Sequence, residues 1–318
     1  MVDRAGDECY TLLPEELEEN IPGGTVFYIA ATSAGTSPIN AGSFSSGGAS
    51  FTFLSEGELS TSEVEFVNNA YTEDDILFKA GEIKLYTFEI PVFPEGVKRS
   101  LEIELTDETG NNVNFALRKG ELIPEPYFEG RPYLHSYGVD EGTDNLSSFE
   151  TSIQTIIEPE PGVYTLAVRS EMLNGDSSTV DLRIEILAPR SLDFCSGAIV
   201  QSNQPAGSWR YFEVIVPNDS DLDGWDLSID PDYVGGNLSL YTRKVNLPFY
   251  TGISGESRTS TAWRDGRQIV SSGSDWTGDP THFNGNTISS TRDLFQFNHP
   301  LVPGRYFVGV WNLSLIHI

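Results

Sequence analysis

Residues Ala206–Pro248 read AGSWRYFEVIVPNDSDLDGWDLSIDPDYVGGNLSLYTRKVNLP, and this stretch decides the fold class. Apolar and polar residues alternate in three runs, at Phe212–Val216, Trp225–Ile229 and Leu238–Tyr241. Proline, glycine, aspartate and asparagine residues separate these runs. Because successive side chains of a strand point to opposite faces, a period of two predicts strands that bury one face. The stretch therefore predicts an all-β protein of antiparallel strands.

The same pattern occurs earlier in the chain, where residues 80–122 read AGEIKLYTFEIPVFPEGVKRSLEIELTDETGNNVNFALRKGEL. Equivalent residues of the two copies align in the same order at three sequence offsets. Pro91 aligns with Pro217 at an offset of 126 residues, Arg118 with Arg243 at 125, and Tyr164 with Tyr306 at 142. Self-similarity over such a length is typical of a repeated module. We therefore predict two copies of one β unit in tandem.

The repeat divides the chain into four expected parts. Residues 1–60 are interpreted as the remnant of a preceding β unit with its linker, since Pro22–Ile29 resembles the strand openings after Pro161 and Pro303. The first β-sandwich is expected over 61–188 and the second, truncated, over 189–312. The final residues, LSLIHI at 313–318, match the translation of a sequencing-library adapter and are interpreted as a non-native tail.

Local patterns give further expectations for the first half of the chain. Short strands are predicted at Phe51–Leu54 and from Val64–Phe66 onward, with a polar connection at Tyr71–Asp75. The sequence Asn174–Asp176 is typical of a hairpin turn. It precedes Val180–Ile186, whose strict alternation and β-branched content favour a strand over a helix.

The composition excludes several classes of partner. The 318 residues include 47 acidic and only 19 basic side chains, for a formal net charge of -28. Such a chain repels nucleic acid and anionic membrane surfaces. Its apolar runs are too short for a transmembrane helix, so no membrane insertion is expected. The acids indicate either a solvated surface or a surface that collects divalent cations.

The two cysteines, Cys9 and Cys195, fall in different parts of the chain. Two lone cysteines form neither a disulfide framework nor a zinc site. A bridge between the parts is left open by the sequence.

A candidate calcium loop follows the first run of the opening stretch. Asp219, Asp221 and Asp223 alternate and are followed by a glycine, a spacing that turns three oxygens toward one cation. The backbone carbonyl of Trp225 can add a ligand, and Asp230 occupies the twelfth position, where an EF-hand has glutamate. The flanks are predicted strands rather than helices, and an exposed Asp/Gly-rich turn is the alternative.

Tryptophans give a second candidate site. Trp263 and Trp276 lie in a Gly/Ser-rich insertion of the second unit and are candidates for an exposed platform that binds sugar or peptide. Local packing is the alternative. Trp225 and Trp311 lie in alternating strands, which favours the core.

The sequence shows no catalytic motif. Apart from the tail, the histidines are His135, His282 and His299, and none belongs to a recognisable motif. No nucleophile elbow, zinc-protease motif or phosphate-binding loop occurs in the chain. We therefore predict that the chain is not an enzyme.

Three features resemble the bacterial pre-peptidase C-terminal (PPC) domain family, a secreted jelly-roll β-sandwich. They are the strand Tyr211–Pro217, the Trp225–Leu227 segment followed by Leu240–Lys244, and the closing run Pro303–Val310. The first unit matches more loosely, since Leu101 replaces the tryptophan. The resemblance implies tandem jelly-roll sandwiches in a secreted or cell-surface protein.

The resemblance also implies function. The family supplies non-catalytic accessory or adhesive modules, so extracellular protein or polysaccharide is the expected partner and calcium the expected ion. In collagen-binding relatives, acids of the segment entering the sandwich hold calcium, which makes Glu73–Asp75 a further candidate against a solvated linker. The alternative is the C-terminal accessory region of a secreted peptidase or other hydrolase whose catalytic domain lies outside this chain. The oligomeric state is left open.

Overall fold

The computed structural model describes residues 9, 11, 21–29, 50, 52–79, 81–107, 113–120, 123, 142–144, 151–170, 177–218, 227–228, 237–248, 268–272, 287–288 and 303–313, and the structural statements below concern these residues. Their regular structure is entirely β, which confirms the predicted fold class. No helix in these ranges is long and apolar enough to cross a membrane. The strands are β1 (Thr61–Glu63), β2 (Ala70–Lys79), β3 (Ile83–Ile90), β4 (Ser100–Asp107), β5 (Val113–Lys119), β6 (Gly142–Asp144), β7 (Thr151–Ile157), β8 (Gly162–Ser170), β9 (Ser177–Leu187), β10 (Arg190–Ser191), β11 (Trp209–Val216), β12 (Leu227–Ser228), β13 (Asn237–Lys244), β14 (Gln268–Ser272), β15 (Thr287–Ile288) and β16 (Gly304–Leu313).

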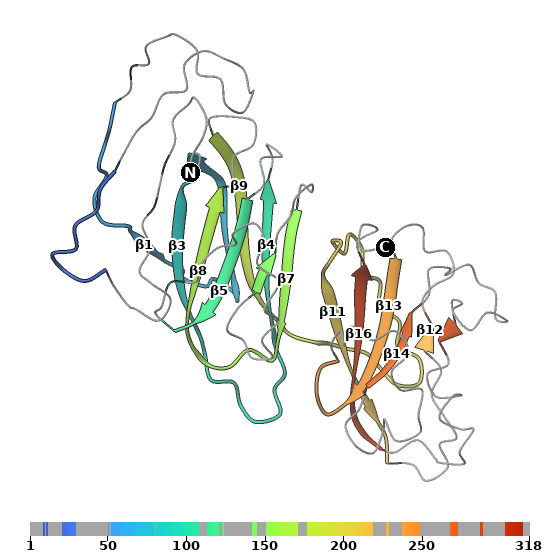
Figure 1. The fold of residues 1–318 in the computed structure, drawn as a ribbon. Coiled ribbons are helices and arrows are strands. Elements are labelled where there is room, and N and C mark those ends of the chain that lie inside the picture. Colours follow the sequence, from blue (N-terminus) through green and yellow to red (C-terminus); the bar gives the residue numbers. More distant parts are fainter. Residues whose placement is uncertain are drawn as a thin grey trace.

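Strands β1–β9, called the first unit below, form a sandwich of two sheets (Figure 1). One sheet has the order β2-β9-β4-β7 and the other the order β1-β3-β8-β5-β6. Strands β2 to β5 alternate between the two sheets, and β7 to β9 alternate again, which is the arrangement of a jelly roll. The small strand β1 is added parallel to β3, and the other pairs are antiparallel.

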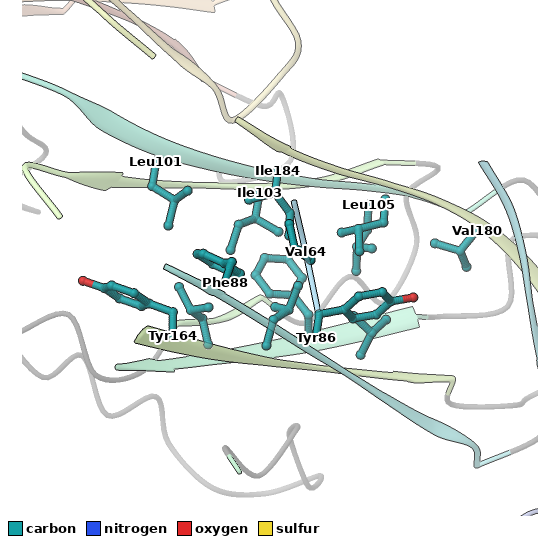
Figure 2. Close-up of a cluster of buried hydrophobic side chains, with 14 of the residues drawn as sticks. Val64, Tyr86, Phe88, Leu101, Ile103, Leu105, Tyr164, Val180 and Ile184 are labelled. Atoms are coloured by element: carbon teal, nitrogen blue, oxygen red, sulfur yellow. The ribbon is translucent and has the colours of Figure 1, made fainter. Parts of the chain in front are cut away.

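Alternate residues of these strands fill the space between the two sheets. In β9 the burial pattern changes at every residue, and its even-numbered side chains from Val180 to Ile186 are buried. Figure 2 shows aromatic rings of β3 and β8 facing aliphatic side chains of β4 and β9. Burial of one such side chain contributes about 1.5–3 kcal/mol. Fully or almost fully buried members are Tyr86, Phe88, Leu101, Ile103, Leu105, Tyr164, Leu182 and Ile184.

Strands β10–β16, called the second unit, contain a five-stranded sheet of order β10-β11-β16-β13-β14 and the strand pair β12–β15. The five-stranded sheet repeats the arrangement of the first one. Strand β10 is parallel to β11, as β1 is to β3, and β16 lies between two antiparallel neighbours, as β8 does.

The registers of the two five-stranded sheets also coincide. Ile90 lies opposite Gly162 in the first sheet, and Val216 opposite Gly304 in the second. These four residues are pairwise related by the shifts of the sequence repeat. Both glycines have positive φ angles, 132° and 137°, a backbone conformation that favours glycine. The burial pattern of β3 is identical to that of β11.

The predicted polar connection at Tyr71–Asp75 is wrong, because these residues belong to β2. The register of β2 against β9 shifts between Glu73 and Ile76, which is a β-bulge. The bulge accommodates Asp75 at a φ angle of 57°, and the Asp75 backbone N–H donates to Asp181 Oδ1 at 2.8 Å. Pairing with β9 therefore overrides the low strand propensity of the acids.

Two other local predictions are wrong. Strand β1 ends before Val64, which turns into the core, although its N–H still donates to the Thr87 carbonyl at 2.8 Å. The residues described within the expected strand Phe51–Leu54, which are 52–54, form no strand. The turn predicted at Asn174–Asp176 lies outside the described residues.

Candidate functional site: the seam between the two units

The two main candidate sites of the sequence lie outside the described residues. These are the calcium loop and the tryptophan platform, with Asp219, Asp221, Asp223, Trp225, Asp230, Trp263 and Trp276. Both sites therefore stay predictions.

The acids Glu73–Asp75 are described, and they do not converge. Glu73 accepts a hydrogen bond from the Tyr71 hydroxyl at 2.7 Å. Burial, and then this contact with Glu73, raises the pKa of Tyr71 to about 12. Asp75 is engaged through its backbone at the bulge with Asp181. Among the described residues, no three His, Cys, Asp or Glu side chains gather closely enough to hold a metal ion. The structure thus gives this second calcium candidate no support.

A different surface stands out in the second unit. In β11 both faces are buried at one end: Phe212 and Val214 point to one side, and Trp209 and Tyr211 to the other. The outer side carries a cluster that we call the aromatic face, made of Trp209, Tyr211, Tyr241, Phe307 and Trp311.

The rings of the aromatic face pack on one another. The Trp209 ring stacks on Tyr211 with centroids 5.6 Å apart and on Trp311 with centroids 5.7 Å apart. Tyr241 lies against the same indole at 4.9 Å. Such pairs contribute about 0.5–1.5 kcal/mol beyond the burial of their area.

Gly309 forms the floor beneath these rings. A Cβ atom built at Gly309 would lie 2.8 Å from Pro248 Cγ, 3.0 Å from Trp209 Cζ3 and 3.1 Å from Tyr211 Cε1. These distances are too short for a real side chain. The absence of a side chain at position 309 therefore lets the aromatic rings lie flat on the sheet.

The first unit covers this aromatic face. Ile157 at the end of β7 packs against the cluster, and Figure 1 shows β7 beside β11. The outward-pointing residues of β4 and β7 are buried in consequence, with Ser100 at 1%, Glu102 at 2% and Ile153 at 7% exposure. We call this contact between the units the seam.

A buried ion pair crosses the seam. Arg210 donates two hydrogen bonds to Glu102, from Nη1 to Oε2 at 2.6 Å and from Nη2 to Oε1 at 3.2 Å. The two side chains are only 16% and 2% exposed. Removal of one partner from such a pair costs about 3–5 kcal/mol, because the other charge stays buried without compensation. Burial, and then the charges of Glu102 and Glu158, raise the pKa of the neighbouring Tyr211 well above its usual value.

A second polar contact lies at the end of the seam. Glu158 accepts hydrogen bonds from Lys98 Nζ at 2.7 Å and from the Leu247 backbone N–H at 2.8 Å. Lys98 also donates to Asn246 Oδ1 at 2.8 Å, and Arg305 donates to the Gly96 carbonyl. The seam thus combines charged and apolar contacts, and the charged pairs favour one register of the two units.

The seam was not predicted from the sequence. Glu102 alternates with apolar residues in β4, and this pattern is typical of a residue that points to solvent. A signal was present in β11, where Trp209 and Tyr211 join Phe212 and Val214, because a strand with two apolar faces is covered on both sides. Trp311, predicted for the core, is half-buried on the outer face.

The open question about the cysteines has a structural answer. Cys9 and Cys195 are both free thiols, Cys9 half-buried and Cys195 exposed.

Comparisons with known proteins give only distant likenesses. No protein-family model matches the chain, and no curated protein matches it. Among solved structures, the pre-peptidase C-terminal domain of a Bacillus anthracis collagenase is similar at 12% identity and a TM-score of 0.26, covering 42% of this chain and 100% of that one. A surface-associated copper-binding protein of Methylomicrobium album is similar at 11% identity and a TM-score of 0.24, covering 41% and 98%. A mutant of the periplasmic inhibitor of g-type lysozyme from Escherichia coli is similar at 12% identity and a TM-score of 0.23, covering 40% and 97%. Likeness at this level does not establish a family or a function.

Proposed function

We propose that the chain is a tandem of non-catalytic β-sandwich modules, the accessory or adhesive part of a secreted or cell-surface protein. The observation that supports this proposal is the repetition of one five-stranded sheet in the same order and register, with the second unit seated on the first. Repetition of a rigid unit sets distance and direction along the chain. This property suits a spacer or a display scaffold, and function then belongs to the loops that the scaffold presents.

The loop proposed to bind calcium is Asp219–Asp223, with the Trp225 carbonyl and Asp230 as further ligands. Three carboxylates close together repel one another unless a cation lies among them. Calcium would therefore stiffen this loop at one end of the second unit.

Calcium titration of the full chain by calorimetry tests the loop, together with thermal unfolding in calcium and in chelator. A cation that binds only the folded protein raises the melting temperature. We expect heat of binding and a stabilising shift in the natural chain, and neither in Asp221→Ala. The matched control is Asp193→Ala, at an exposed aspartate outside the loop, which keeps both effects. Equal binding by Asp221→Ala and the natural chain would remove the loop from the proposal.

The proposed ligand surface carries Trp263 and Trp276, and the class of ligand is extracellular polysaccharide or protein. Affinity electrophoresis in gels that contain defined soluble polysaccharides, and binding to immobilised extracellular-matrix proteins, test both classes. Retardation or binding that Trp263→Ala and Trp276→Ala abolish supports an adhesive module. Binding that is unchanged in both variants contradicts this surface.

A further inference from the structure

We propose that the outer face of the five-stranded sheet is a docking face in both units, and that its occupant in each case is the chain that precedes the unit. In the second unit the occupant is the first unit, through β4 and β7. This inference goes beyond the proposed function and requires neither calcium nor a ligand.

The outer face of the first unit is apolar at the corresponding positions. Ile83 and Leu85 of β3 point away from the sandwich core and form a separate buried cluster with Ala167. Leu85 lies opposite Ala167 in the register, as Tyr211 lies opposite Gly309 in the second unit. The two sheets therefore present an apolar outer patch at the same place.

The first unit's patch is covered, and the covering residues include ones that precede the unit. Leu59 packs against the cluster, as does Ile123. Without a cover, Ile83 and Leu85 would be exposed to solvent, yet they are only 7% and 2% exposed. Leu59 therefore has the role in the first unit that Ile157 has in the second.

Two equivalent glycines lie beside the docked segments, too close for a side chain in the first unit and at an ordinary contact distance in the second. Gly81 and Gly207 precede β3 and β11, and their φ angles are 71° and 85°. A Cβ atom at Gly81 would collide with the backbone carbonyl of Cys9, and one at Gly207 would lie 3.8 Å from the backbone carbonyl of Ile153. In both units this glycine therefore faces a backbone carbonyl of the preceding chain.

Cys9 also lies close to the turn between β2 and β3, so the preceding chain contacts this turn as well as the sheet. Burial is the main cause that raises the pKa of the Cys9 thiol, and the nearby charges of Glu82 and Glu56 raise it further. Glu56 itself pairs with Lys79 at 2.6 Å. In both units, the outer face of the sheet is contacted by the part of the chain that comes before that unit. A head-to-tail contact of this kind can be repeated from unit to unit without closing a ring.

Thiol labelling of the full chain tests the docking in the first unit. The rate of iodoacetamide reaction at Cys9 is measured by peptide mass spectrometry, with the exposed Cys195 of the same molecule as the internal reference. We expect Cys9 to react more slowly than Cys195, because burial and a raised pKa both lower the reactivity of a thiol.

Leu59→Asp removes the apolar contact without changing the sheet, and it should accelerate labelling of Cys9 about tenfold relative to Cys195, as expected when a segment opens locally. The matched control is Leu54→Asp, at a leucine that is 73% exposed, which should leave the ratio unchanged. Circular dichroism of both variants shows whether the first unit stays folded, so that faster labelling in a folded Leu59→Asp variant reports local opening. A natural chain in which Cys9 reacts as fast as Cys195, or a Leu59→Asp variant with an unchanged ratio, would overturn the proposal.

Discussion

The two five-stranded sheets differ mainly in the chemistry of their outer faces. Ile83 and Leu85 occupy in the first sheet the places of Trp209 and Tyr211 in the second, in strands with an identical burial pattern. The aliphatic patch contacts a leucine of the preceding segment, whereas the aromatic face contacts a whole folded unit. The inner faces of the two sheets thus set the register of the strands. The outer face of each sheet is adapted to the part of the chain that packs on it.

The sharpest test of this comparison substitutes the basic residue next to the patch in each sheet. Arg210→Ala leaves Glu102 buried without a partner and should lower the free energy of unfolding by about 3–5 kcal/mol. Lys84→Ala at the equivalent place removes an ion pair with Glu82 at 3.7 Å and should cost about 0–1 kcal/mol. Urea unfolding of both variants gives the two values. Equal costs would contradict a specific role for the seam.

A smaller effect is expected at the residue beneath each patch. Gly309→Ala places a Cβ atom 2.8 Å from Pro248 Cγ and pushes against the rings of Trp209 and Tyr211, and overpacking of this kind costs about 1–3 kcal/mol. Ala167→Gly in the first sheet removes one methyl group and should cost about 0.5–1 kcal/mol. Near-ultraviolet circular dichroism reports the tryptophan environment and should change only in Gly309→Ala. An unchanged spectrum would show that the rings do not rest on this glycine.

The turn after β5 and after β13 gives a third comparison. Gly120 and Val245 are equivalent, and both have positive φ, 108° and 76°. A β-branched residue is strained there, so Gly120→Val should lower stability by about 1–2 kcal/mol. Val245→Gly relieves the backbone strain of a β-branched residue at positive φ, but glycine loses more conformational entropy on folding. The free energy of unfolding of this variant should therefore stay within about 1 kcal/mol of that of the natural chain. Thermal unfolding measures both, and a neutral Gly120→Val would contradict the equivalence of the turns.

The smallest expected effect concerns pH. Burial and then repulsion by Glu102 raise the pKa of Glu104, while Arg183 and Arg210 lower it. Between the usual pKa of about 4.3 and the raised pKa of the folded form, the folded protein binds a proton that the unfolded protein releases. This carboxyl therefore lowers stability as pH rises through that window. In Glu104→Gln this contribution disappears. The melting temperature of the variant minus that of the natural chain should increase from about pH 4 to pH 7, and a decrease would contradict the direction of the shift.

Much of the fold was predictable because alternation reports directly on burial. The runs around Phe212 and Val180 were assigned to strands, and both are strands with alternating burial. The repeat anchors Tyr164 and Tyr306 were found from sequence, and both are fully buried in equivalent strands. These features depend on residues close together in the chain.

The errors share a different cause. Tyr71–Asp75 was assigned to a connection because acids disfavour strands, and only the pairing of β2 with β9 explains why they form one. Glu102 appears solvent-facing in its own strand, and its partner Arg210 is distant in the sequence. The first contact depends on how two distant strands of one sheet pair, and the second on how one unit packs against the other. The sequence around each residue therefore does not reveal its partner.

The seam holds the two units together through specific contacts, and a double-mutant cycle at Glu102 and Arg210 measures how strongly one such pair is coupled. The free energy of unfolding is measured for the natural chain, Glu102→Ala, Arg210→Ala and the double variant. We expect a coupling energy of about 1.5 kcal/mol or more, as for close charge pairs in interfaces. Additive costs, within about 0.5 kcal/mol, would mean that the two residues act independently and would contradict the account.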